Sequence, residues 1–318
     1  MTISTKKFIF GLGFFFLITL IGMIVAASRV PKNFPIGQFD INIPLSSSLD
    51  NISNKLESKR IISSPFLFKV LIVIFGGGDG IFAGDYRFTE GQNAFTIASR
   101  LTAGQHGLPK VKITIPEGTN VYDMAYIYLT KLTNFNAPKF VALALREEGY
   151  LFPDTYFFFS NTKPEAIIKE MRANFDKKIS TLTLDTKPGG RTLKDIIIMA
   201  SIVEEEARGL EDKKIVAGIL WKRLDDNMLL QVDAPFYYLT AKKGSFTLDD
   251  LKIDSPYNTY LYKGLTKGPI SNPGLESIMA AINPVKTKYY FYLTGKDGKM
   301  RYASTYDGHI QNKNIYLN

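Results

Sequence analysis

Three consecutive glutamates, Glu204, Glu205 and Glu206, are the side chains of the sequence best suited to acid and base chemistry. Cysteine is absent, which excludes thiol nucleophiles, iron–sulfur clusters and disulfides. Only two histidines occur, His106 and His309, too few for a histidine-rich metal site. Carboxylate or hydroxyl chemistry remains, and we expect neither a cofactor nor a metal.

A helix predicted from a Thr192 cap to about Arg208 determines where the three carboxyl groups point. Neighbouring residues of a helix lie about 100° apart, so the three glutamates face three directions. Glu206 continues an apolar stripe at helical spacing, whereas Glu204 is placed to pair with Arg208 one turn on. The stripe is formed by Ile196, Met199 and Val203.

The apolar stripe has a chemical consequence for Glu206. A carboxyl group against an apolar wall loses hydration of its charged form, so its pKa rises toward the range in which it donates protons at neutral pH. Cleavage of a glycosidic bond requires such an acid. A solvated acidic run at the end of a helix is the alternative, and spacing alone does not exclude it.

A single membrane anchor is predicted near the N-terminus. Residues 8–27 are an uncharged apolar run of twenty residues, about the length that a helix needs to cross a bilayer. Lys6 and Lys7 favour a cytoplasmic tail over residues 1–7 and place the chain after Ser28 outside the cytoplasmic membrane.

A cleaved signal peptide is the alternative for this segment, because Val25, Ala26 and Ala27 resemble a cleavage site. The apolar run is longer than the roughly 7–15 residues of a signal core, which favours an anchor. In both cases the rest of the chain is exported. The net charge of +9 indicates an anionic partner, and export argues for lipid or wall polymer and against nucleic acid.

The exported part is predicted to belong to the α+β class. After a linker at residues 31–44, we expect a short amphipathic helix from Leu49 to Ile61, a buried helix or strand at 66–75 and a glycine turn at 76–80. The turn lacks the Gly-Lys-Ser/Thr ending of a phosphate-binding loop.

The following region mixes strands and helices. A strand at 111–115 precedes a helix capped by Asn120, and a second helix runs from Pro164 to about Lys178. The aromatic segment 149–158 suits a domain junction or the wall of a cleft. Residues 289–293 have the aromatic density of a strand, most of which we expect to be core.

A series of different short motifs is distributed along nearly the whole chain. The main ones are Met199-Ala-Ser-Ile-Val-Glu-Glu-Glu, Val216-Ala-Gly-Ile-Leu-Trp-Lys-Arg-Leu, Met228-Leu-Leu-Gln-Val-Asp, Ser255-Pro-Tyr-Asn-Thr-Tyr and Gly264-Leu-Thr-Lys-Gly-Pro-Ile-Ser-Asn-Pro-Gly. Others are Ala83-Gly-Asp-Tyr-Arg-Phe, Ile115-Pro-Glu-Gly, Gly149-Tyr-Leu-Phe-Pro-Asp-Thr-Tyr and Ala280-Ala-Ile-Asn-Pro-Val-Lys-Thr-Lys-Tyr-Tyr. In order and spacing the series resembles the MltG (YceG-like) endolytic murein transglycosylases.

The resemblance implies a function and a domain order. Glu206 matches the catalytic glutamate of the family's Ser-Ile-Ile/Val-Glu-x-Glu motif. Residues 28–148 would contain a LysM-like subdomain that touches glycan, and residues 149–318 a mixed α+β catalytic domain. The implied reaction cuts the MurNAc-β-1,4-GlcNAc bond within peptidoglycan strands and leaves 1,6-anhydro-MurNAc ends. It would limit strand elongation beside peptidoglycan synthases, the penicillin-binding proteins.

The resemblance also places residues near the cleft. Gln231 and Asp233 are expected to hydrogen-bond sugar or to orient Glu206, with a polar turn as the alternative. Tyr257 and Tyr260 offer aromatic faces for sugar rings, or they are buried structural residues.

Two further residues are expected to bind substrate. Asn258 offers an amide for an N-acetyl group. His309 falls where the family tends to have a histidine near the end of the domain.

The sequence departs from the family pattern at three places along the expected cleft. It has Asp233-Ala234-Pro235 for Asp-Pro-Thr, Thr266-Lys267 for a double proline and Asn283-Pro284 for His-Pro. These changes leave open a catalytically impaired, membrane-tethered scaffold that binds peptidoglycan. A nucleic-acid binder, indicated only by charge and by the aromatic and basic residues of 289–301, is disfavoured by export.

Overall fold

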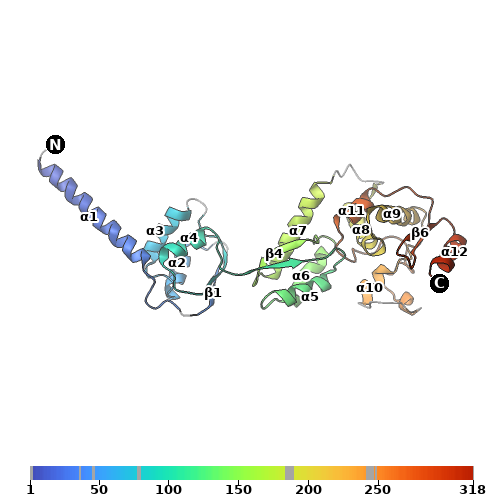
Figure 1. Ribbon diagram of the computed structural model, residues 1–318, viewed down its shortest axis with the longest axis horizontal. Helices are drawn as coiled ribbons and strands as arrows, with labels where there is room; N and C mark the ends of the chain where they lie inside the picture. The colour runs from blue at the N-terminus through green and yellow to red at the C-terminus, as the bar shows by residue number, and fades with distance from the viewer. Residues whose placement is uncertain are drawn as a thin grey trace. The chain divides into compact units, whose positions relative to one another are not determined.

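The computed structural model describes residues 3–35, 37–44, 47–76, 80–182, 190–240, 247 and 249–317. The chain divides into two compact units, Met1–Pro109 and Lys110–Asn318, and most of their elements are labelled in Figure 1. The boundary expected at 148/149 lies inside the second unit. The expected turn at 76–80 lies mostly outside the described residues. Both units mix helices and strands, which confirms the α+β class.

The first unit contains an apolar helix and a small α+β core. Its elements are α1 (Ile3–Ser28), β1 (Phe39–Ile43), α2 (Leu49–Ser58), α3 (Pro65–Gly76), β2 (Gly84–Phe88) and α4 (Ala94–Thr102). Residues Gly11–Ser28 of α1 have a mean hydropathy of 2.2 and are 6% buried, so α1 is long and apolar enough to cross a membrane.

The core of the first unit forms where the amphipathic helices cover a two-stranded antiparallel sheet. β1 and β2 pair from Phe39 opposite Phe88 to Ile43 opposite Gly84. α2 buries Ile52 and Leu56, as its spacing predicts. The segment expected as a buried helix or strand is the helix α3, which buries one face and exposes the other. Its buried residues are Leu67, Phe68, Leu71 and Ile72.

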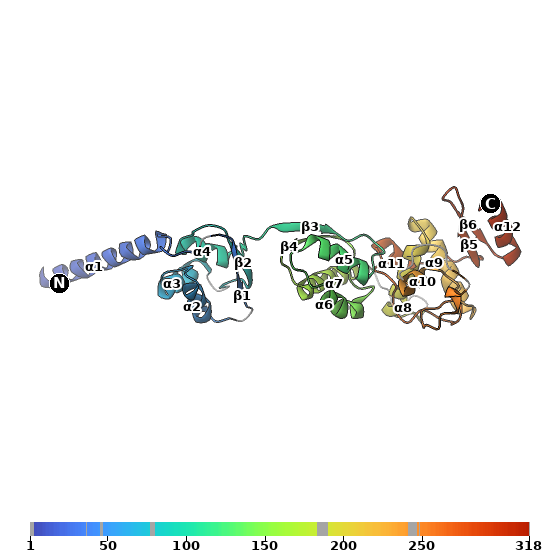
Figure 2. The same ribbon diagram turned by 90° about the horizontal axis from the view of Figure 1, so that it is seen from below.

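The second unit carries the remaining elements, which Figure 2 shows from a second side. Its helices are α5 (Val121–Lys131), α6 (Ala137–Ala144), α7 (Pro164–Ser180), α8 (Leu193–Glu206), α9 (Leu210–Asp225), α10 (Ala234–Thr240), α11 (Leu275–Ile282) and α12 (Tyr306–Tyr316). Its strands are β3 (Lys110–Thr114), β4 (Thr155–Phe159), β5 (Phe291–Thr294) and β6 (Met300–Ala303), which pair antiparallel as β3 with β4 and β5 with β6.

Two hydrophobic clusters meet within this unit. One joins β3 and β4 to α5, α6 and α7, and the other surrounds α8 between α9 and α11. Leu151 belongs to the first cluster and Phe152, the next residue, to the second. The aromatic segment predicted to form a junction therefore lies where the two clusters meet.

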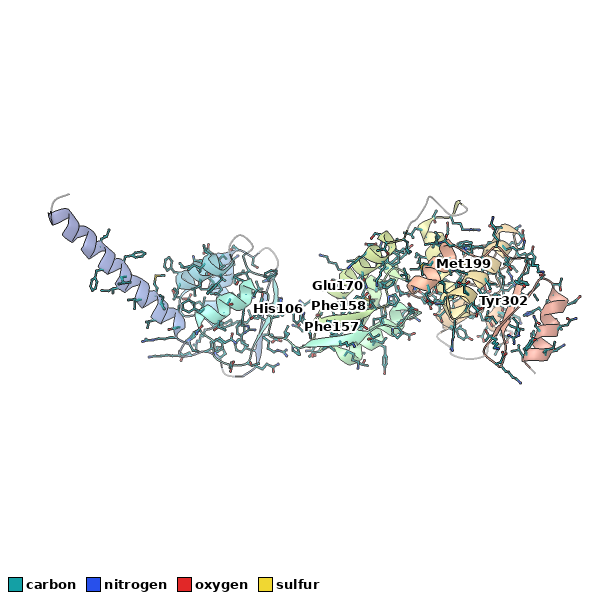
Figure 3. The ribbon with its side chains drawn as sticks, turned by 45° about the horizontal axis from the view of Figure 1, so that its top comes forward. His106, Phe157, Phe158, Glu170, Met199 and Tyr302 are labelled. Atoms are coloured by element: carbon teal, nitrogen blue, oxygen red, sulfur yellow. The ribbon has the colours of Figure 1, made fainter. Side chains whose placement is uncertain are left out.

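α8 is the central helix of the second cluster. Thr192 caps it as predicted: its Oγ1 accepts the N–H of Asp195 at 3.2 Å, and the Asp195 carboxylate accepts the N–H of Thr192 at 2.8 Å. Every residue from Ile196 to Val203 is buried, including Met199, which Figure 3 labels. The helix ends at Glu206, two residues earlier than expected. Burial on all sides fixes the direction of its last turn.

The predicted pair of Glu204 with Arg208 is wrong, because Arg208 lies beyond the end of α8. Lys213 of α9 pairs with Glu204 instead, at 2.9 Å, and both side chains are nearly buried. The second oxygen of Glu204 accepts the N–H of Gly274 at 2.8 Å. One carboxylate thereby joins α8, α9 and the start of α11.

A second buried carboxyl group joins the two clusters. Glu148 accepts the N–H of Val121 at 3.0 Å and the side-chain N–H of Asn272 at 2.6 Å. Asn272 also accepts the N–H of Leu151 at 2.9 Å. Burial raises the pKa of Glu148 to about 7.

Replacing Lys213 with Met should lower the free energy of unfolding by about 3 kcal/mol, because the Glu204 carboxylate would stay buried without its partner. The neighbouring Lys214→Met variant is the control, since Lys214 pairs with the largely exposed Glu211. This substitution should lower the free energy of unfolding by less than about 0.5 kcal/mol. Denaturant unfolding of both variants measures the difference. Equal losses would contradict a structural role of the buried pair.

Replacing Glu148 with Gln should change how stability depends on pH. The pKa is raised from 4.5 to about 7 on folding, so its contribution to stability is complete below pH 4.5 and is lost as pH rises through 7. From pH 5 to pH 8 the free energy of unfolding of the wild type should therefore fall by up to about 3 kcal/mol relative to that of Glu148→Gln. Denaturant unfolding measures it.

The control for this comparison is Glu170→Gln, at an exposed position of α7 that is labelled in Figure 3. Its stability should follow the wild type at every pH. If Glu148→Gln also follows the wild type, the raised pKa of Glu148 is wrong.

Candidate active site

A pocket of about 320 Å³ opens beside the last residue of α8. Its wall includes Glu206 of α8, Arg223 of α9, the turn around Asp233, Tyr292 of β5 and His309 of α12. Segments far apart in the sequence thus meet around one carboxyl group, and α8, α9, β5 and α12 can be followed in Figure 2.

Glu206 is partly exposed to this pocket, and its carboxylate accepts the hydroxyl of Tyr292 at 2.9 Å. Burial raises the pKa of Glu206 to about 7, and the negative charge of Asp233 acts in the same direction. The Tyr292 hydroxyl and the backbone N–H of Ala234 oppose this rise, because they stabilise the ionised form. At neutral pH both protonation states are populated, so the group can donate and then accept a proton.

Ala234 is one of the expected departures from the family pattern, for which the resemblance implies proline at this position. Because alanine keeps its N–H and proline has none, this chain has a hydrogen bond to Glu206 that the usual residue cannot make. The residues at the other two departures have local structural contacts. Thr266 donates to the carbonyl of Gly268 at 2.8 Å, and Asn283 ends α11.

Arg223 is a buried residue of the pocket wall that holds two segments together. Its guanidinium donates to the carbonyl oxygens of Leu230 at 2.5 Å and Tyr290 at 2.7 Å. It lies over the Phe291 ring, 5.3 Å from the centroid. Arg223 therefore connects the turn before Gln231 to the start of β5.

Gln231, Asp233 and Tyr260, three of the candidate site residues, lie together on the pocket wall. The Tyr260 hydroxyl donates to Asp233 Oδ1 at 2.6 Å. Gln231 has a left-handed backbone with φ of 48°, and its N–H donates to the carbonyl of Thr259 at 3.1 Å. Hydrogen bonds thus join the motif at residues 228–233 to the motif at residues 255–260. Gln231 itself is exposed.

His309 also lines the pocket. Its ring stacks on Phe291 at 5.4 Å between centroids. Burial, with Lys313 and Arg223 adding to it, lowers the pKa of His309, so the ring is neutral at pH 7. Its Nδ1 is buried and has no hydrogen-bond partner within the described part of the chain.

Asn258 has a structural environment instead of the substrate-facing one expected. It is 1% exposed, its amide donates to the carbonyls of Leu251 and Ile253, and its oxygen accepts the N–H groups of Tyr260 and Leu261. No donor or acceptor of the side chain is left for an N-acetyl group.

Tyr257 lies away from the described wall of the pocket and packs on Tyr238, with 5.3 Å between ring centroids. This position favours the structural alternative for Tyr257, whereas Tyr260 remains at the pocket.

The prediction that residues 289–293 are mostly core is wrong for β5. Phe291, Tyr292 and Leu293 are partly exposed and line the pocket. Sequence reasoning missed Tyr292 and Arg223 as partners of the site, because their contacts with Glu206 and Tyr290 depend on tertiary structure. Among the described residues, no group of three or more His, Asp or Glu side chains is arranged to hold a metal ion.

Comparison with known proteins identifies the family of the chain. The sequence model of the YceG-like family matches residues 41–315. The chain belongs to the YceG-like family.

Two relatives are both named endolytic murein transglycosylase. The protein of Bacillus subtilis (strain 168) is 31% identical over 306 residues, which cover 87% of this chain and 84% of that protein. The protein of Streptococcus pneumoniae serotype 2 (strain D39) is 37% identical over 180 residues, which cover 54% of this chain and only 33% of the relative.

A solved structure has the same fold over most of the chain. The crystal structure of a YceG-like protein from Listeria monocytogenes superposes with a TM-score of 0.56 at 29% identity. The match covers 87% of this chain and 99% of that chain.

Replacing Tyr292 with Phe should raise the pKa of Glu206 above 7, because the hydroxyl stabilises the ionised carboxylate. Infrared difference spectroscopy of the carboxyl group, with Glu206→Gln as the blank, measures the midpoint. Tyr290→Phe is the control, since its hydroxyl donates to Asp226 instead. A midpoint that stays unchanged in Tyr292→Phe would show that this hydrogen bond does not hold the carboxylate.

Proposed function

We propose that this protein is an endolytic murein transglycosylase that cuts the MurNAc-β-1,4-GlcNAc bond within peptidoglycan strands. The observation that carries the proposal is the Glu206 carboxyl group, with a pKa of about 7, on the wall of a pocket in a member of the YceG-like family. The names of the two relatives support the same reaction class.

Glu206 acts first as an acid. In its protonated form it donates its proton to the glycosidic oxygen, and the bond from that oxygen to the anomeric carbon of MurNAc breaks. Positive charge develops on the sugar ring, and the newly ionised Glu206 and the Asp233 carboxylate stabilise it. GlcNAc leaves with the donated proton.

Glu206 acts next as a base. Its carboxylate takes the proton of the MurNAc C6 hydroxyl while that oxygen attacks the anomeric carbon, which closes a 1,6-anhydro ring. The nucleophile comes from the substrate, so no water enters and Glu206 ends the cycle protonated. One carboxyl group therefore serves where most glycosidases need two.

The other pocket residues position the sugar. The exposed amide of Gln231 and the neutral His309 ring offer hydrogen-bonding groups, and Tyr260 holds Asp233 toward the pocket. Tyr292 orients Glu206 and limits the rise of its pKa.

We also propose a location for this activity. α1 anchors the chain in the cytoplasmic membrane by a single span, and the second unit lies outside it, where peptidoglycan is made. A LysM-like part of the exported chain binds glycan, and cleavage limits the elongation of new strands beside peptidoglycan synthases such as penicillin-binding proteins.

The proposal is tested by incubating the full chain in detergent with purified peptidoglycan strands and identifying the products by mass spectrometry. The wild type should release fragments with 1,6-anhydro-MurNAc ends. Glu206→Gln should reduce the rate by at least about 1,000-fold, because an amide is too weak an acid to protonate the glycosidic oxygen.

Glu211→Gln, at an exposed glutamate five residues on, is the control and should keep the wild-type rate. Strands bound by the wild type but left intact would favour the scaffold. Products with hydrolysed, reducing ends would contradict the proposed attack by the C6 hydroxyl.

A further inference from the structure

A second hollow of the second unit adjoins the Glu206 pocket. It is a groove of about 970 Å³, a volume at the upper end of the range typical of small-molecule sites. α5 forms one wall and α10 the other, while the loop at 117–120 and Glu205 of α8 complete it. α5, α8 and α10, which are labelled in Figure 2, all belong to the second unit.

Aromatic rings on both walls make this groove unusual. Tyr122 and Tyr126, one turn apart on α5, are 52% and 69% exposed, and Tyr237 and Tyr238 face them from α10. The rings of Tyr122 and Tyr238 lie 6.5 Å apart between centroids. Exposed tyrosines combine a flat apolar face with a hydroxyl, and this combination suits the apolar faces and hydroxyl groups of sugar rings.

Carboxylates lie between the aromatic residues. Glu117, Asp123 and Glu205 line the same groove. A carboxylate accepts hydrogen bonds at both oxygens, so it can hold neighbouring hydroxyl or amide N–H groups of a sugar.

The groove and the Glu206 pocket are lined by consecutive residues at two places in the chain. Glu205 borders the groove and Glu206 the pocket, and Ala234 borders the groove while Asp233 borders the pocket. A polymer whose bond lies at Glu206 would therefore pass close to the groove.

We infer that this groove binds the sugar residues of the glycan strand next to the bond that is cut, with Tyr122 and Tyr126 as stacking residues. An enzyme that cuts inside a strand must hold the polymer on both sides of the bond, and the pocket at Glu206 measures only about 320 Å³. This inference rests on the proposed function and names the residues that bind the strand beyond the reacting sugar.

The test compares a Tyr122→Ala, Tyr126→Ala double variant of the full chain with the wild type in detergent. Both tyrosines are exposed on α5, where alanine favours the helix, so folding should be unaffected. With long, peptide-free glycan strands, KM should rise about tenfold while kcat stays within about twofold, because the lost contacts hold the strand and not the reacting atoms.

Binding is measured separately with Glu206→Gln, which leaves the strands intact. Adding the two tyrosine substitutions to Glu206→Gln should raise the dissociation constant for the same strands about tenfold. Phe157→Ala is the control for both measurements, because Phe157 is a similarly exposed aromatic residue on β4, outside the groove. Figure 3 labels Phe157.

The outcomes separate this inference from the proposed function. Unchanged KM and dissociation constant, or a fall in kcat alone, would overturn the groove assignment while the wild type still forms anhydro products. Tyrosine-dependent binding by a wild type that forms no products would support the groove and contradict the proposed reaction.

Discussion

The incomplete hydration of one carboxyl group is the constraint on which the site depends. Glu206 ends a helix whose residues from Ile196 to Val203 are all buried, and burial of its carboxyl group raises its pKa to about 7. A carboxylate in this position is unfavourable by itself. The hydroxyl of Tyr292 and the N–H of Ala234 offset part of that cost, so the ionised form is also populated at neutral pH.

The rest of the second unit holds this carboxyl group in place. The capping box at Thr192 fixes the start of α8, and the buried pair of Glu204 with Lys213 fixes its end against α9. Arg223 connects the turn before Gln231 to β5, which carries Tyr292. Neighbouring glutamates on one turn thus have different tasks: Glu204 is structural, Glu205 borders the groove and Glu206 borders the pocket.

Local patterns predicted the elements well and the contacts between them less well. The caps at Asn120 and Thr192 depend on residues a few positions apart, and the structure confirms them. The predicted stripe of α8 is buried, but so is every other residue from Ile196 to Val203. Lys213, Tyr292 and Arg223 were missed because their partners come from other elements. Asn258 was expected to face substrate. Its side chain is instead buried and hydrogen-bonds to four backbone groups, two carbonyls and two N–H groups.

The most direct test of the central claim is the pH dependence of kcat/KM on glycan strands, which reports the pKa of the essential acid in the free enzyme. If a protonated Glu206 starts the reaction, kcat/KM should be level below pH 7 and fall about tenfold per pH unit above it. A fall that begins near the ordinary glutamate value of 4.5 would show that Glu206 is well hydrated and would contradict the account.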